Sequence, residues 1–159
     1  MGEYTMNEKK KNIVILIADD DPDDRFMIKE SLEEINLPNI INFVEDGEQL
    51  MDYLKHRGSY AGKADTPLPG LILLDLNMPK KDGREVLSEI KIDKSLCMIP
   101  VVVFTTSKAE EDIIRSYNLG VNSFITKPLT FDSLVDIMKT LTRYWLEIVE
   151  LPDNIMNCR

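Results

Sequence analysis

The sequence contains little cysteine and little positive charge, and both scarcities narrow the class of protein. The two cysteines, Cys97 and Cys158, have no metal-ligand spacing, and such sparse use fits a cytoplasmic protein best. The formal net charge is −9, from 28 acidic residues against 19 lysines and arginines. So acidic a chain is not expected to bind nucleic acid or an anionic membrane.

Long apolar stretches are also absent. No segment has the apolar length of a membrane span, and the first residues lack the apolar core of a signal peptide. A chain of 159 residues is long enough for one domain with a sizeable core. We therefore expect a domain over 12–150, a charged, mobile lead-in over 1–11 and a short tail over 151–159, with no room for a further domain.

Five apolar runs rich in valine and isoleucine divide the chain: 13–18, 39–45, 70–76, 99–106 and 120–125. Continuous apolar runs are typical of strands covered on both faces. Capping pairs predict helix starts between them: Asp21 before Pro22, Asp46 with Gln49, Asp82 with Glu85, and Ser107 with Glu110. The alternation predicts an α/β protein, a (βα)5 doubly wound fold with helices on both faces of a parallel five-stranded sheet. Right-handed crossovers leave few ways to wind such a sheet, and we expect the flavodoxin-like order 2-1-3-4-5, in which the first strand lies beside the third.

A dense group of acids follows the first apolar run. The stretch LIADDDPDDR, residues 16–25, carries aspartates at 19, 20, 21, 23 and 24. Like charges this close repel one another, so either water solvates them or a cation belongs among them. We interpret Asp23 and Asp24 as helix-start residues favoured by the helix dipole, and Asp19 and Asp20 as candidate ligands.

Polar groups also stand at the ends of other predicted strands. Asp75 ends the third, Thr105 ends the fourth, and Lys127 follows the fifth. Doubly wound sheets bind their ligands beyond these carboxyl ends. Together with Asp19 and Asp20, Asp75 suits a hard divalent cation such as Mg²⁺. A carboxylate, a lysine and a hydroxyl beside such a cation suit phosphoryl transfer, with Asp75 as the nucleophile.

Four motifs follow one another along the chain: DD at 19–20, LLDLNMP around Asp75, FTT around Thr105 and TKP around Lys127. Over roughly residues 12–149 this set resembles the response-regulator receiver domain of two-component signalling. The resemblance implies that Asp75 accepts a phosphoryl group from a phosphohistidine. The donor would be a sensor histidine kinase or a histidine phosphotransfer protein of a phosphorelay.

The resemblance also implies roles for individual residues. Mg²⁺ would be bound by Asp20, Asp75 and the backbone carbonyl of Asn77, with Asp19 acting mainly through water. Lys127 would pair with Asp75 and then with the phosphoryl oxygens.

The remaining roles concern the switch. Thr105 would turn to hydrogen-bond the phosphoryl group, and Phe124 would follow it inward. The peptide bond before Pro128 would be cis. Two residues depart from the family pattern: Phe124 lacks the hydroxyl of the more frequent tyrosine, and Thr106, where alanine or glycine is usual, could crowd access to the acyl phosphate.

A looser resemblance concerns the long segment 57–69, the TTS after the fourth strand and the ending RYWLEIVELP. These features resemble stand-alone regulators paired with bacterial phytochrome kinases, so the partner kinase could be a bacteriophytochrome. We expect a single-domain switch rather than an enzyme, with only self-phosphorylation and slow autodephosphorylation.

The output surface would be the face formed by the fourth helix, fifth strand and fifth helix. Aromatic residues gather near its edges: Tyr117, Phe124, Tyr144 and Trp145. One interpretation is that these aromatic residues form the interface of a homodimer. The alternative is that they only pack the helices onto the sheet.

Two further functions remain open from the residues alone. From Asp19 the acids are spaced as in a calcium-binding EF-hand loop ending at Glu30, but Asp24 stands where that loop needs glycine. An aspartate-nucleophile phosphatase would also use Asp75, but Asn77 stands where its general acid belongs. A flavodoxin-like cofactor carrier would need a phosphate loop rich in serine, threonine or glycine after the first strand, which this sequence does not have.

Overall fold

The computed structural model describes residues 12–62 and 67–152, so the predicted lead-in and most of the predicted tail lie outside the described residues. The elements alternate along the chain as predicted. They are β1 Ile15–Ala18, α1 Pro22–Glu34, β2 Ile41–Val44, α2 Gly47–Lys55, the 3₁₀ turn η1 Gly58–Tyr60, β3 Leu71–Leu74, α3 Gly83–Ile92, β4 Val101–Thr105, α4 Glu110–Asn118, β5 Ser123–Thr126, α5 Phe131–Arg143 and the π-helical segment η2 Tyr144–Ile148.

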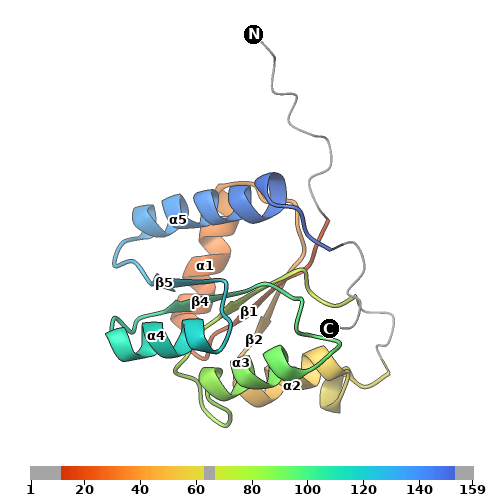
Figure 1. The fold of residues 1–159 in the computed structure, drawn as a ribbon. Helices are drawn as coiled ribbons and strands as arrows, with labels where there is room; N and C mark the ends of the chain where they lie inside the picture. The colour runs from red at the N-terminus through yellow and green to blue at the C-terminus, as the bar shows by residue number, and fades with distance from the viewer. Residues whose placement is uncertain (1–11, 63–66, 153–159) are drawn as a thin grey trace.

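The strands form one parallel sheet in the order β2-β1-β3-β4-β5, which confirms the predicted fold. Helices α1 and α5 cover one face, and α2, α3 and α4 lie on the other (Figure 1). The register pairs Ala18 of β1 with Leu74 of β3. The residues that follow, Asp19 and Asp75, therefore leave the sheet side by side at its carboxyl edge.

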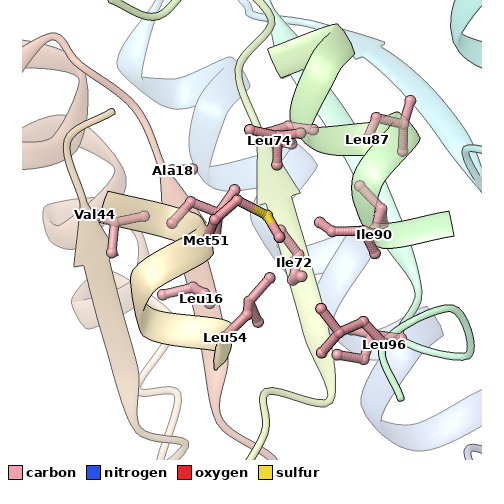
Figure 2. Close-up of a cluster of buried hydrophobic side chains, with 14 of the residues drawn as sticks. Leu16, Ala18, Val44, Met51, Leu54, Ile72, Leu74, Leu87, Ile90 and Leu96 are labelled. Carbon is pink, nitrogen blue, oxygen red and sulfur yellow. The ribbon is translucent and has the colours of Figure 1, made fainter. Parts of the chain in front are cut away.

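Alternate residues of the central strands fill two separate apolar cores. On one face Leu16 and Leu74 pack against α2 and α3 (Figure 2). On the other face Ile17 and Leu73 pack against α1 and α5. This two-sided burial explains why the strands are continuously apolar. Among the described helices, none has both the length and the apolar character to cross a bilayer.

Three of the four predicted helix starts are correct. The side chains of Asp21, Asp46 and Asp82 cap α1, α2 and α3 by accepting hydrogen bonds from backbone N–H groups. The fourth prediction is wrong, because α4 begins at Glu110 without a side-chain cap. The Ser107 hydroxyl instead donates to Asp112 Oδ2 at 2.6 Å and accepts from the Ala109 N–H at 3.3 Å.

Candidate functional site

Backbone hydrogen bonds bring the candidate residues to one edge of the sheet. The Asp75 N–H donates to the Ala18 carbonyl at 3.0 Å, and the Lys127 N–H donates to the Thr105 carbonyl at 2.7 Å. These bonds extend the parallel ladders one residue beyond β3 and β5. The carboxyl ends of the strands thus fix the backbone of the acid and the lysine that the sequence singled out.

Lys127 is the centre of the site. Its Nζ donates to Asp19 Oδ2 at 2.7 Å, to Asp24 Oδ2 at 2.7 Å and to Asp75 Oδ2 at 3.0 Å. An ammonium group has three N–H bonds, so each of them has a carboxylate partner here. Burial lowers the pKa of Lys127, but hydrogen bonds to Asp19 and Asp24 and the charge of Asp75 outweigh it, and the net pKa is raised. The lysine is therefore a fixed positive charge.

Asp19 is almost completely buried, with 1% of its surface exposed. Burial raises its pKa, and the hydrogen bonds from Lys127 and from the Asp21 N–H only partly offset that effect. The Arg25 guanidinium donates to the Asp19 backbone carbonyl at 2.8 Å rather than to the carboxylate. The carboxylate remains short of positive charge, which an added cation would supply.

Three carboxylates converge as a cation site would require. Asp19, Asp20 and Asp75 each offer one oxygen, and these oxygens lie within 4.8 Å of one another. Asp20 is exposed while Asp19 and Asp75 are buried, so the cluster opens to solvent on one side. Such an all-oxygen set suits a hard divalent cation that retains several waters. Asn77, the fourth predicted ligand, follows closely, and its N–H lies 3.4 Å from Asp75 Oδ1.

The predicted switch residues lie nearby with different exposures. Thr105 is buried at the end of β4, and its Oγ1 accepts a hydrogen bond from the Ser107 N–H at 3.5 Å. Thr106 is exposed. Phe124 is half-buried on β5 and packs against the core on the α2–α3 face. The bond between Lys127 and Pro128 is trans, so the expectation of a cis peptide is wrong for this structure.

Two features of the site could not be inferred from the sequence. Asp24 does lie in the first turn of α1, as predicted, but it also binds Lys127. The only sequence feature that could have indicated this contact is the position of Asp24 in the first turn of α1, directly after the acidic residues that follow β1. The second feature is an ion network in which Arg84 binds Asp82 and Asp112. No local spacing indicates a pair that is 28 residues apart.

The fold and the strand-end residues together define the class of the protein. It is a doubly wound α/β domain with a carboxylate cluster and a lysine at the carboxyl edge of its sheet. The chain matches the family model described as response regulator receiver domain over residues 15–139. It therefore belongs to the receiver-domain family of two-component signalling, as the resemblance predicted.

Individual relatives agree with this assignment. The chain is 43% identical to the response regulator Rcp1 from Synechocystis sp. over 139 residues, which cover 87% of this chain and 92% of Rcp1. The crystal structure of Mn²⁺-bound Rcp1 matches with a TM-score of 0.80 and 43% identity, covering 88% of this chain and 99% of that one. The phosphorylated cyanobacterial phytochrome response regulator RcpA matches with a TM-score of 0.82 and 44% identity, covering 89% and 99%.

Membership in the family gives the chain the role of a phosphoryl acceptor. A calcium-binding loop is also incompatible with the structure, because α1 begins at Pro22 and the segment up to Glu30 is helical instead of looped around an ion. The family match lends no support to a phosphatase or to a flavodoxin-like cofactor carrier.

Proposed function

We propose that Asp75 is the phosphoryl acceptor and that the donor is a phosphohistidine on a sensor histidine kinase or a histidine phosphotransfer protein. The observation that carries the proposal is the contact between Lys127 Nζ and Asp75 Oδ2, at 3.0 Å, inside the carboxylate cluster. An Asp75 oxygen attacks phosphorus, so that an O–P bond forms while the N–P bond breaks. The imidazole leaves with the bonding electron pair.

The surrounding residues would prepare Asp75 for this reaction. Asp19, Asp20, Asp75 and the Asn77 carbonyl would hold Mg²⁺, which supplies charge neutralisation for the phosphoryl oxygens. Lys127 carries a fixed positive charge and would hydrogen-bond a phosphoryl oxygen.

Thr105 and Thr106 would act from the end of β4. The Thr105 hydroxyl, at the end of the adjacent strand, would turn to hydrogen-bond another phosphoryl oxygen. The exposed side chain of Thr106 would limit how water reaches the acyl phosphate.

Apolar groups beside the site support a protein as the phosphoryl donor. Leu129 is 97% exposed and Met27 is 36% exposed. Met27 and Leu129 line a pocket together with Lys127. An exposed apolar patch beside a charged site is typical of a protein contact. The similarity to the phytochrome regulator RcpA supports a bacteriophytochrome as the kinase. The receiver unit would span residues 12–150 and would act in the cytoplasm.

The proposed output surface is the α4-β5-α5 face. All residues of β1, β3 and β4 are buried, whereas those of β5 are all half-buried. Only Ser116 of α4 is buried, and its hydroxyl lacks a hydrogen-bond partner among the described residues. Weak packing and an unsatisfied hydroxyl support α4 and β5 as the element that changes position when the site is phosphorylated. Phe124, packed beneath, would move with it.

The same face would form a homodimer. Tyr117 is 50% exposed and Tyr144 is 49% exposed, whereas Trp145 is half-buried and packs edge-to-face with Tyr144. Sedimentation velocity with and without beryllofluoride, an acyl-phosphate mimic, tests this part. We expect a dimer that the mimic strengthens, and a monomer under both conditions at tens of micromolar, an order-of-magnitude choice for modest affinity, would contradict it.

Phosphotransfer profiling tests the function as a whole. The chain is incubated with each autophosphorylated histidine kinase of its source organism, bacteriophytochromes included, and early transfer is measured. We expect rapid transfer from one kinase to Asp75, with slow autodephosphorylation and no turnover of free phosphate esters. If no kinase transfers at a rate above that to the Asp75→Asn variant, the proposal is wrong.

A further inference from the structure

Asp24 differs from Asp19 and Asp75 in how it contacts Lys127. Asp19 and Asp75 belong to the carboxylate cluster that could hold a cation, whereas Asp24 does not. Asp24 instead reaches Lys127 from the first turn of α1, with 38% of its side chain exposed. The lysine is thus tied both to the cluster and to a helix outside it.

The donors of Lys127 are fully used before any phosphoryl group arrives. Its contacts with Asp19 and Asp24 measure 2.7 Å each, and its contact with Asp75 measures 3.0 Å. For Lys127 to donate to a phosphoryl oxygen, one of these hydrogen bonds has to break. Asp75 loses its charge when it becomes an acyl phosphate, and Asp19 is shared with the cation cluster. Asp24 is neither modified by the reaction nor part of the cation cluster, so its contact with Lys127 is free to persist.

We propose that Asp24 is a positioning residue for phosphoryl transfer to Asp75. Its carboxylate holds the Lys127 ammonium from the side of α1. Lys127 can then exchange its hydrogen bond with Asp75 for one with a phosphoryl oxygen while the ammonium stays in position. This inference rests on the proposed function, because it assumes that Asp75 is the acceptor. Asp24 acts through Lys127 and does not itself touch the reacting atoms.

Burial makes this contact stronger than an ordinary surface ion pair. Exposed pairs contribute little because water screens them and both side chains lose entropy. Here the Lys127 side chain is only 8% exposed, and the backbone of Asp24 is fixed by the first turn of α1, where its N–H donates to the Asp21 cap. Little additional entropy is lost when these two groups meet, so the contact can direct the ammonium.

A set of three variants tests the inference. Asp24→Asn keeps the shape but removes the charge, Asp24→Glu keeps the charge, and Asp23→Asn makes the same charge change on the neighbouring residue. The rate of Mg²⁺-dependent phosphorylation by acetyl phosphate is followed by intact mass. Because Asp24→Asn removes the Coulombic attraction between the two groups and leaves the ammonium only a neutral acceptor, we expect this variant to be about fivefold slower. Asp24→Glu should recover most of the rate, and Asp23→Asn should match the wild type.

Two further measurements separate positioning from a structural effect. Metal affinity should be equal in Asp24→Asn and wild type, because Asp24 is not in the cation cluster. A ¹H–¹⁵N spectrum of lysine Nζ groups should show a slowly exchanging Lys127 ammonium in the wild type that weakens in Asp24→Asn. Equal phosphorylation rates in Asp24→Asn and Asp23→Asn would overturn the inference, as would an unchanged Lys127 signal. If Asp75→Asn is still labelled, the proposed function fails instead.

Discussion

The described residues include two cation-centred networks that contrast in almost every respect. The Lys127 side chain is 8% exposed, lies where the strands end and contacts three carboxylates. Arg84 lies at the start of α3 and faces two carboxylates, Asp82 and Asp112, which cap or begin helices. The first network joins elements far apart in sequence at the candidate site. The second ties the start of α3 to α4.

One acid in each network has a shifted pKa, and the two shifts have opposite directions. Hydrogen bonds from Ser107 and Arg84 lower the pKa of Asp112, because its charged form is well satisfied. Burial raises the pKa of Asp19, because desolvation outweighs the hydrogen bonds from Lys127 and from the Asp21 N–H. The directions of the two pKa shifts separate an ion network that stabilises its carboxylate from a cluster in which a carboxylate is left desolvated. The Arg84 network has one cation for two carboxylates, whereas the Lys127 network has one cation for three, so the Lys127 network carries more unneutralised negative charge.

The largest expected effect is on phosphorylation. Asp75→Asn should abolish the mass increase produced by acetyl phosphate or by a phosphorylated kinase, because it removes the nucleophile and leaves the fold intact. Asp112→Asn, which makes the same charge change in the Arg84 network, should still be labelled. A full phosphate adduct on Asp75→Asn would assign the acceptor elsewhere.

The next largest effect concerns the place where the two networks approach each other. A Cβ on Gly83 would lie 2.4 Å from the Asp75 carbonyl oxygen and 2.7 Å from the Leu76 Cα, and backbone atoms cannot move aside cheaply. Gly83→Ala should therefore reduce the free energy of unfolding by about 2–3 kcal/mol, as overpacking does. Urea unfolding measures the change.

The control for this substitution is Glu85→Ala, an exposed position in the same helix. It should change the free energy of unfolding by about 0.5 kcal/mol or less. A Gly83→Ala variant as stable as Glu85→Ala would mean that the start of α3 can withdraw from Asp75.

The same contrast explains how much the sequence predicted. Asp19, Asp20, Asp75 and Lys127 were identifiable because each follows an apolar run, and parallel strands bring their carboxyl ends together. The five strands and three helix starts were predictable from equally local signals, namely continuous apolar runs and capping residues. The order of the sheet was expected from the few ways in which right-handed crossovers can wind it.

Long-range contacts of residues that do not stand at the end of a strand were not predictable in this way. Asp24 contacts Lys127, which lies 103 residues further along the chain. The start of α4 was misplaced for a related reason, because Ser107 donates to Asp112, and Asp112 is held by Arg84 in α3. A capping residue and a residue held by a distant network look the same in sequence.

A smaller effect is expected from the cation. Mg²⁺ at ten to thirty times its dissociation constant should raise the free energy of unfolding by about 1–2 kcal/mol, because it relieves the repulsion in the carboxylate cluster. Asp20→Asn should lose most of this gain, and Asp112→Asn should retain it. Urea titrations with Mg²⁺ or a chelator measure the difference. No effect of the chelator on the wild type, or far tighter binding of Ca²⁺ than of Mg²⁺, would count against the assignment.

The smallest expected effect is the pH-dependent contribution of the Arg84 network to the free energy of unfolding. The pKa of Asp112 is lower in the folded protein than its ordinary value of 3.8, mainly because of the Ser107 hydroxyl and then Arg84. A lowered pKa contributes stability that is present above the unfolded pKa and is lost as the pH falls through the folded pKa. Asp112→Asn should therefore be less stable than wild type at pH 7, by about 1 kcal/mol or less because the pair is partly exposed.

That difference in stability should disappear on acidification, since protonated aspartate and asparagine are both neutral. Urea unfolding of the two proteins from pH 7 to pH 3 and below measures it, with the gap expected to narrow once the pH falls below about 3.8. Glu111→Gln removes a neighbouring charge from the same turn and controls for net charge. A gap that stayed constant down to the lowest pH would mean that Asp112 acts through shape and hydrogen bonding alone, and the contrast with the charge-deficient Lys127 network would then be one of burial rather than of charge.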